Sequence, residues 1–505
     1  MEEIPSVIRK GGLSLVYYSL TAFLSMIISL IATRKLEPIE FGTYQFLVIL
    51  ASLFNLGISS LGWFLTRFIA RGYDVKKEAI KIGSLLILVS DLLLFLFLIF
   101  VTNISIPMSF NLILLTVLLF FSQSLFLLFA NAIQGIDVSI TYLSNVIQAI
   151  ARLSLLFIGI YILFEKLSVE FFIVVIFIAN LLAAIFLFAK LLKFKGRYQK
   201  NVLMNTFKKF WYVPFLNSLF ISMIIYDSAL MTILLSSTIT LAFFRSAYII
   251  AGVVSYVQVF VQAYYREFLE KDSIKGLTQA IKVLVLLSSM IAFLIISIGD
   301  LLLAILRPFY VPSYPALILL SISFFIGNMA SLFGSSILSS EKTDLYTSEK
   351  SFRNTQFYTI TKVLLLQTIF QYFGIIFLAY LSKIFALEPV VIAFYWSLIW
   401  LIVNIFTFSL YYRKIRELSS ITFPKVSIVK YILISIFSSA IVYIVKPRNI
   451  SANLFLQFFI SSLYAILYFS IFFILLLIID ESIRKRIIRI MLSFLNKNSW
   501  LKNIW

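Results

Sequence analysis

Apolar runs of about 20 residues recur along the whole chain, and each is long enough to cross roughly 30 Å of hydrocarbon as a helix. The chain has 505 residues, of which 62% are hydrophobic and 13% charged. A soluble core cannot hide so much apolar surface. The sequence therefore predicts an all-α polytopic membrane protein.

Charged residues and Pro, Gly or Asn breaks divide these runs into fourteen predicted transmembrane helices. Their ranges are 12–33, 43–65, 82–101, 111–131, 142–164, 170–190, 211–234, 241–262, 277–298, 313–338, 358–381, 388–411, 428–445 and 453–479.

The distribution of Lys and Arg between the loops sets the expected orientation. With the N-terminus inside, 33 of the 42 Lys and Arg fall on the inner side and 7 on the outer side. The remaining two, Arg152 and Arg245, lie within spans. We therefore expect a multi-pass protein of the cell membrane with both termini in the cytoplasm.

The composition also excludes several classes of function. The chain has no Cys and no His, so thiolate nucleophiles, the usual general base and the common zinc ligands are missing. We expect no metal and no cofactor. The net charge of +20 follows from topology and contact with anionic lipid headgroups, and it does not indicate a nucleic-acid partner.

Two halves of the chain resemble each other at an offset of about 200 residues. Aligning Gly42 with Ala242 places Arg67 within one residue of Arg266. Because an even number of spans separates the copies, their symmetry axis should run along the membrane normal. The alternative is accidental similarity between helices that share a small apolar alphabet.

The repeat predicts two pseudo-symmetric lobes around a central cavity, as in a transporter that rocks between two states. The predicted division is an N-lobe over 1–195, a C-lobe over 196–411, an additional helix pair over 412–482 and a basic amphipathic cytoplasmic tail over 483–505.

Arg152 ends a polar stripe on the fifth predicted span. Thr141, Asn145, Gln148 and Arg152 follow spacings of four, three and four residues, which place them on one helical face. A buried arginine is costly in a bilayer, so this face should line a cavity. The alternative is a structural pair between Arg152 and a carboxylate such as Asp91 in the third span.

Arg245 and Tyr248 begin a similar stripe on the eighth span, which continues through Ser255, Gln258 and Gln262. The stripe favours a cavity wall, although Arg245 lies close enough to the outer end to snorkel to the headgroups. Asp227 lies mid-span in the seventh run, with Asn217 on the same predicted face. This carboxylate could be protonated, bind a coupling cation or pair with an arginine.

Several segments, in order, resemble the polysaccharide and oligosaccharidyl-lipid flippases of the multidrug/oligosaccharidyl-lipid/polysaccharide exporter (MOP) superfamily. They are KGG at 10–12, RKLEPIEFGTYQ at 34–45, TRFIA at 66–70, Gln134-Gly135, the Arg152 segment and YDSALMTILLS at 226–236. The resemblance implies fourteen helices in two lobes, a central cavity lined by helices 1, 2, 7 and 8, and alternating access. By position, Arg152, Arg245 and Arg67 correspond to the cationic residues that meet the substrate phosphate.

The resemblance predicts a flippase, not an enzyme, that carries a polyprenyl-(pyro)phosphate-linked oligosaccharide from the inner to the outer leaflet, for surface polysaccharide or glycoprotein assembly. It leaves Na⁺ or H⁺ open as a coupling ion. Expected partners are the lipid-linked sugar, membrane lipids and glycan-assembly enzymes, with the protein itself a monomer. The alternatives are a drug/cation antiporter of the same superfamily and an integral-membrane glycosyltransferase or polysaccharide polymerase.

Overall fold

The computed structural model describes residues 3–104, 106–163, 167–197, 202–258, 275–339, 356–418, 423–447, 453–481 and 484–485, with side chains from Val16 onward. Arg266, the predicted partner of Arg67 in the repeat, and Gln262 of the predicted stripe lie outside the described residues. The predicted tail over 483–505 also lies outside them, apart from Arg484 and Lys485.

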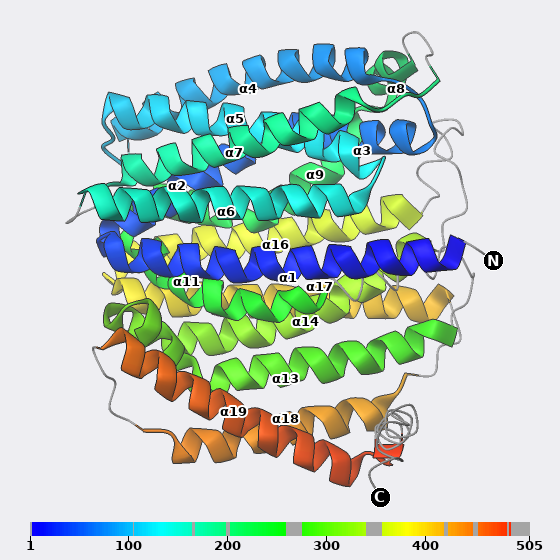
Figure 1. The fold of residues 1–505 in the computed structure, drawn as a ribbon. Helices are drawn as coiled ribbons and strands as arrows, with labels where there is room; N and C mark the ends of the chain where they lie inside the picture. Colours follow the sequence, from blue (N-terminus) through cyan, green and yellow to red (C-terminus); the bar gives the residue numbers. More distant parts are fainter. Residues whose placement is uncertain are drawn as a thin grey trace, which may run out of the picture.

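The described chain is helical throughout its membrane-spanning part (Figure 1). The first half contains α1 (Glu3–Lys35), α2 (Pro38–Leu53), α3 (Leu56–Ala70), α4 (Lys76–Ile104), α5 (Phe110–Gln134), α6 (Val138–Leu163) and α7 (Val169–Leu192). The second half contains α8 (Val202–Phe210), α9 (Tyr212–Ile225), α10 (Asp227–Leu235), α11 (Ile239–Ala251), η1 (Gly252–Val257), α13 (Lys275–Leu306), η2 (Pro308–Ser313), α14 (Tyr314–Ser339), α16 (Gln356–Ile384), α17 (Pro389–Leu418), α18 (Lys425–Val445) and α19 (Leu454–Ile479).

Within the described ranges, twelve helices are long and apolar enough to cross a membrane, and the number rises to fourteen if each of two bent pairs forms one span. The all-α multi-pass prediction is confirmed. The bent pairs are α2 with α3, at 51°, and α9 with α10, at 50°. They correspond to the second and seventh predicted spans, each of which the hydropathy pattern predicts as one continuous helix.

The helices pack in two groups. Helices α1 and α3 to α7 pack mainly among themselves, as do α10 to α17, while α2 and α9 each contact both groups and α18 and α19 pack against α13 at one edge. Figure 1 shows α1 lying across the middle of the molecule, and it shows that α1 begins at the end of the bundle where α19 ends. We call this end the predicted inner end, and the opposite end the predicted outer end.

Both copies of the proposed repeat lose regular α-helix at the same place. The second span breaks between Leu53 and Leu56, and the eighth changes to a 3₁₀ helix over Gly252–Val257. With the offset of 200, the second segment corresponds to positions 52–57 of the first copy. The irregular turns of the second and eighth spans therefore fall at matching positions of the proposed repeat, whereas the break between α9 and α10 has no counterpart in the continuous α1.

Candidate functional site

The two groups of helices meet closely at the predicted outer end, where α2 crosses the start of α11. A Cβ atom added at Gly42 would overlap the carbonyl group of Thr238. The Thr238 hydroxyl donates a hydrogen bond of 3.1 Å to the carbonyl oxygen of Ile39. Only glycine permits this approach between the backbones. The α2–α11 contact therefore forms a tight seam between the predicted lobes.

Two arginines make further contacts beside the seam, one donating from each group of helices to the other. From the end of α1, Arg34 donates from Nε to the carbonyl of Ile305 at 2.7 Å and from a terminal nitrogen to that of Ala304 at 3.2 Å. In return, Arg307 donates to the carbonyl oxygen of Leu36 at 3.0 Å. These bonds join the first helix to the end of α13, so the structure is closed at the predicted outer end.

We predict that Gly42→Ala opens this seam. The added methyl group collides with rigid backbone, so α2 and α11 must separate. Because the protein has no cysteine, a thiol introduced by Leu36→Cys at a fully buried seam position is its only labelling site. Its reaction with a water-soluble maleimide should rise several-fold when Gly42→Ala is added. The matched control is Gly252→Ala, where a Cβ meets no atom within 4 Å; equal labelling in both backgrounds would contradict the prediction.

Asp227 lies at the bend between α9 and α10 and is completely buried. Its Oδ2 atom accepts hydrogen bonds from three side chains: the indole of Trp396 at 2.8 Å, the indole of Trp400 at 2.6 Å and the amide of Gln371 at 2.9 Å. The Ser228 hydroxyl donates to Oδ1 at 3.2 Å. Burial of a carboxylate is costly unless its oxygens are hydrogen-bonded, and here neutral donors supply that stabilisation.

Gln371 also explains how the chain bends here. The same amide nitrogen donates to the carbonyl oxygen of Ile224 at 3.0 Å, in the last turn of α9. A broken membrane helix leaves backbone groups without partners, and neighbouring helices must supply them. Gln371 on α16 therefore holds the broken end of α9 and the carboxylate of Asp227 together.

Arg245 on α11 lies beside this cluster. Its side chain is only 8% exposed, so it is buried in protein and does not extend to the outer end. The guanidinium carbon lies 4.8 Å from the ring centre of Tyr248, a cation–π contact. The preceding residue, Phe244, stacks on Trp396 with ring centres 3.9 Å apart. The indole that binds Asp227 therefore also positions the helix turn that carries Arg245.

Arg245 and Asp227 attract each other but form no ion pair, because their charged atoms do not approach within 4.0 Å. Within the described part of the chain, the Nε atom of Arg245 has no hydrogen-bond partner. The arginine therefore keeps donor capacity that the protein does not use. This capacity could bind the oxygens of an anionic ligand.

Arg152 lies in the other helix group, among α5, α6 and α7. A terminal nitrogen donates to Oδ1 of Asn180 at 3.0 Å, and Gln148 donates to the same oxygen. The amide nitrogen of Asn180 donates to Ser122 at 3.3 Å. The predicted stripe thus brings Gln148 and Arg152 onto one acceptor. Asn145, one turn earlier, is partly buried and has no hydrogen bond to any described residue.

Arg152 is not paired with Asp91, the alternative that the sequence left open. Among the described residues, Asp91 forms no ion pair and its buried Oδ1 has no hydrogen-bond partner. The Nε atom of Arg152 is likewise buried without a partner. Each predicted lobe therefore contains one membrane-buried arginine that is not neutralised by a contacting carboxylate.

Arg67 lies in the last turn of its helix, whereas Arg152 and Arg245 lie within α6 and α11. Arg67 is exposed near the end of α3, at the predicted inner end, and its guanidinium carbon lies 3.8 Å from the ring centre of Trp63. The structure does not bring the three predicted phosphate contacts into one place.

Sequence reasoning missed the residues that organise both arginine sites: Asn180, Gln371, Trp396 and Trp400. Each is a polar or amphipathic side chain within an apolar run, which is a usable signal for a buried hydrogen bond. The two tryptophans are four residues apart, so both indoles lie on one face of α17. The sequence does not show that both indoles donate to the same partner, Asp227.

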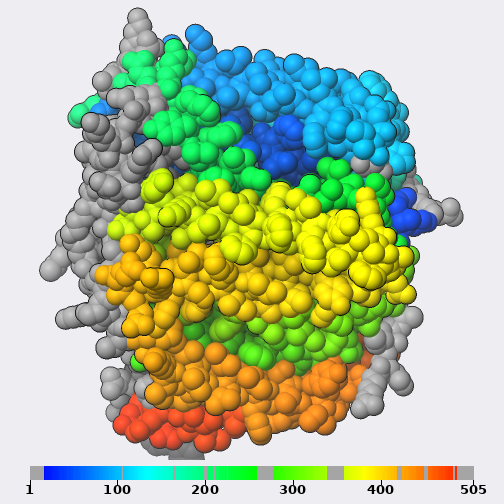
Figure 2. All heavy atoms as spheres, turned by 180° about the vertical axis from the view of Figure 1, so that it is seen from behind, coloured from blue at the N-terminus to red at the C-terminus, as the bar shows by residue number. Residues whose placement is uncertain are grey.

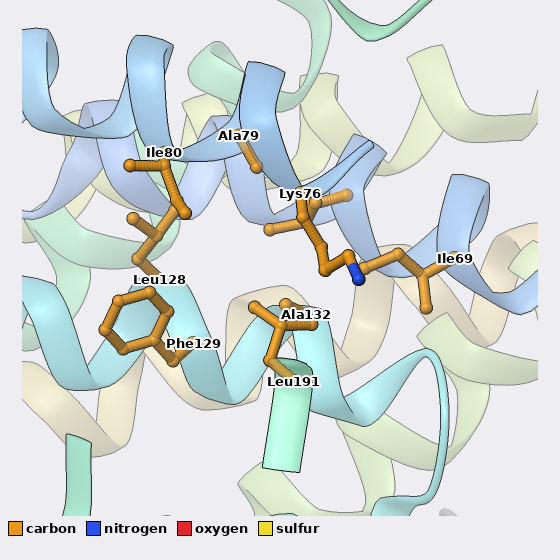
Figure 3. A pocket seen from close by; sticks show the side chains of 9 residues that line it. Ile69, Lys76, Ala79, Ile80, Leu128, Phe129, Ala132 and Leu191 are labelled. Carbon is orange, nitrogen blue, oxygen red and sulfur yellow. The ribbon is translucent and has the colours of Figure 1, made fainter. Parts of the chain in front are cut away.

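Another hollow lies among α3, α4, α5 and α7, and Figure 3 shows its lining. Lys76 is the only charged residue there, and its amine donates to the carbonyl oxygen of Phe194 at 2.7 Å. The space is too small for a water molecule. It is a packing gap within the N-terminal helices and not a ligand site. Within the described ranges, no group of three His, Cys, Asp or Glu side chains could hold a metal.

Comparison with known proteins rests on structure, since no protein family profile and no curated sequence matches the chain. The structure is similar to that of "Lipid II flippase MurJ, inward closed conformation", with a TM-score of 0.63 and 15% sequence identity over 91% of this chain and 99% of the other. The chain has the fold of MOP superfamily transporters.

Within the MOP fold, the multidrug transporters align over a smaller part of the chain. An inward-facing multidrug resistance MATE family transporter gives a TM-score of 0.53 at 15% identity, over 80% of this chain and 98% of the other. A MATE transporter from Vibrio cholerae gives 0.52 at 12% identity, over 83% and 99%. The flippase structure thus accounts for more of the chain than either transporter does.

Proposed function

We propose that the protein is a flippase for a polyprenyl-(pyro)phosphate-linked oligosaccharide. The observation that carries this proposal is the pair of buried arginines, Arg152 and Arg245, one in each helix group and neither in contact with a carboxylate. Guanidinium groups bind phosphate through paired hydrogen bonds and stay protonated. The MOP fold and the coverage of the lipid II flippase structure support the same class of substrate.

The mechanism is an exchange between states open to the inner and outer sides. In the present state, the Gly42–Thr238 contact and the Arg34 and Arg307 hydrogen bonds close the predicted outer end. Release to the outer leaflet requires these contacts to break. The phosphate passes near the arginines, the saccharide occupies the space between the lobes, and the lipid chain remains in the bilayer.

The antiporter alternative is less well supported by the charges. A cation carrier needs carboxylates that are free to bind its substrate, whereas the buried carboxylate of Asp227 accepts bonds from three N–H donors. Asp480, the other charged acid that is deeply buried in the described chain, is paired with Lys430 at 2.8 Å. Two unpaired arginines would repel a cation.

Reconstitution tests the proposal against both alternatives. A fluorescent polyprenyl-diphosphate saccharide is placed in vesicles with the purified protein, and the fraction reaching the opposite leaflet is measured by bleaching with a membrane-impermeant reductant. The proposal predicts protein-dependent transfer without formation of longer sugar chains. Polymer formation from the same donor would identify an enzyme, and uptake of an organic cation without lipid transfer would identify an antiporter.

A further inference from the structure

An apolar pocket of about 350 Å³ lies at the boundary between the two helix groups, toward the predicted inner end. Helices α3 and α4 form one wall, and α8 and the start of α9 form the other. The lining residues are Gly57, Ser60, Leu86, Phe207, Lys208, Trp211 and Phe215. Three of these side chains are aromatic. The pocket differs from the arginine sites, which lie on α6 and α11.

The walls of the pocket are fixed across the boundary. The Ser60 hydroxyl donates to the carbonyl oxygen of Trp211 at 3.1 Å, which joins α3 to the start of α9. Phe207 packs edge-on against Phe64 of α3, with ring centres 6.1 Å apart. The backbone of Met204 on α8 donates to Glu78 of α4 at 3.0 Å. The pocket is therefore a built feature and not a gap beside a loose helix.

The pocket lies on the lipid-facing side of the bundle. Leu85 and Leu88, which flank its residue Leu86 on α4, are each 63% exposed, and Trp211 is 45% exposed. Figure 2 shows the dark blue atoms of α2 and α3 in a recess between the lighter blue helices above and the green and yellow ones below. A hydrocarbon chain could reach such a recess directly from the bilayer.

Among the described side chains, Lys208 is the one charged group that lines the pocket, and its amine makes no hydrogen bond or ion pair with any of them. On α3, the pocket residues Gly57 and Ser60 and the exposed Arg67 are spaced by three and seven residues, so they share one helical face. Positive charge thus lies where the apolar pocket approaches the predicted inner surface. The apolar walls of the pocket could bind a hydrocarbon chain, and the positive charge at its end could bind the phosphate on that chain.

We propose that this pocket binds the first isoprenoid units of a lipid phosphate, with Lys208 contacting the phosphate. This proposal rests on the function proposed above. It assigns a binding site, here called the seat, to the lipid part of that substrate. The seat is separate from Arg152 and Arg245, and it lies beside the bend that begins α3. It would hold the lipid at the boundary between the lobes before its headgroup reaches the buried arginines.

Equilibrium binding of radiolabelled farnesyl phosphate to the full-length protein, in nanodiscs of neutral lipid, tests this seat. Lys208→Gln should weaken binding of farnesyl phosphate about tenfold and leave binding of farnesol unchanged, because it removes one charge-assisted contact. Lys208→Arg should restore most of the affinity. Gly57→Leu, which fills the pocket near Leu86, should weaken both ligands. The matched control is Lys282→Gln, at a different inner-end site, which should change neither.

Three results would overturn the seat: unchanged binding in Lys208→Gln, unchanged binding of both ligands in Gly57→Leu, or equal displacement by phosphatidylglycerol, which would show an ordinary lipid site. Inorganic phosphate alone should not compete at matched concentration. The vesicle assay separates the two proposals. Normal transfer by Lys208→Gln and Gly57→Leu would contradict the role of the pocket in lipid binding but not the flippase function. Farnesyl phosphate binding by a protein that transfers no lipid would contradict the flippase function but not the binding pocket.

Discussion

Replacing Arg245 with alanine is expected to reduce transfer of a phosphate-bearing lipid by on the order of 100-fold. The substitution removes two charge-assisted hydrogen bonds to phosphate, each of about 1.5 kcal/mol or more, from a site shielded from water. Insertion should be unaffected, since the arginine has no ion-pair partner to leave unpaired. Transfer is measured in vesicles at matched protein content.

Two further variants make this result specific. Arg245→Lys keeps the charge but loses the planar fork, so it should recover only part of the rate. Arg413→Ala removes an arginine whose side chain is 84% exposed at the predicted inner end, and it should transfer at the wild-type rate. If Arg245→Ala and Arg152→Ala both transfer normally, the arginines do not meet the phosphate.

The second large effect concerns Asp227. We expect Asp227→Asn to lower the free energy of unfolding by about 3 kcal/mol, because a neutral amide oxygen accepts three N–H donors more weakly than a carboxylate oxygen does. The two indoles and the Gln371 amide all donate to one oxygen, so an asparagine oxygen in that position keeps the three partners but binds each of them without the negative charge. Denaturant unfolding of the purified protein in detergent measures the change.

The control for Asp227→Asn is Glu417→Gln, on the same helix as the tryptophans but with a side chain that is 52% exposed. It should unfold like the wild type. The same experiment tests the coupling-ion hypothesis for Asp227. N–H donors cannot ligate Na⁺, so added Na⁺ should not stabilise the wild type relative to K⁺. Stabilisation by Na⁺ that disappears in Asp227→Asn would contradict the hydrogen-bonded arrangement.

The sequence predicted the spans well because hydropathy and helix length are local properties. The polar stripe on the fifth span also placed Gln148 and Arg152 correctly on one face, since α6 is a continuous helix. The reasoning for the seventh span was wrong. It placed Asn217 on the same face as Asp227 by a spacing of ten residues, but the 50° bend between α9 and α10 breaks that periodicity.

The partners of the buried charges could not be predicted. Asn180, Trp396 and Trp400 are separated from the groups they bind by 28 to 173 residues, and one sequence contains no record of which distant side chains meet. The bend between α9 and α10 has the same origin. Gln371 from α16 bonds both the Ile224 carbonyl and Asp227 at the break, so the bend depends on a distant residue that the local sequence does not show.

The most direct test compares two lipids that carry the same fluorescent saccharide on the same polyprenyl chain, one through a diphosphate and one through a neutral glycosidic link. The arginine-centred account predicts that the vesicle-reconstituted protein transfers the diphosphate lipid much faster, and that Arg152→Ala with Arg245→Ala removes the difference. Equal transfer of both lipids by the wild type would show that the phosphate is not recognised and would contradict the account.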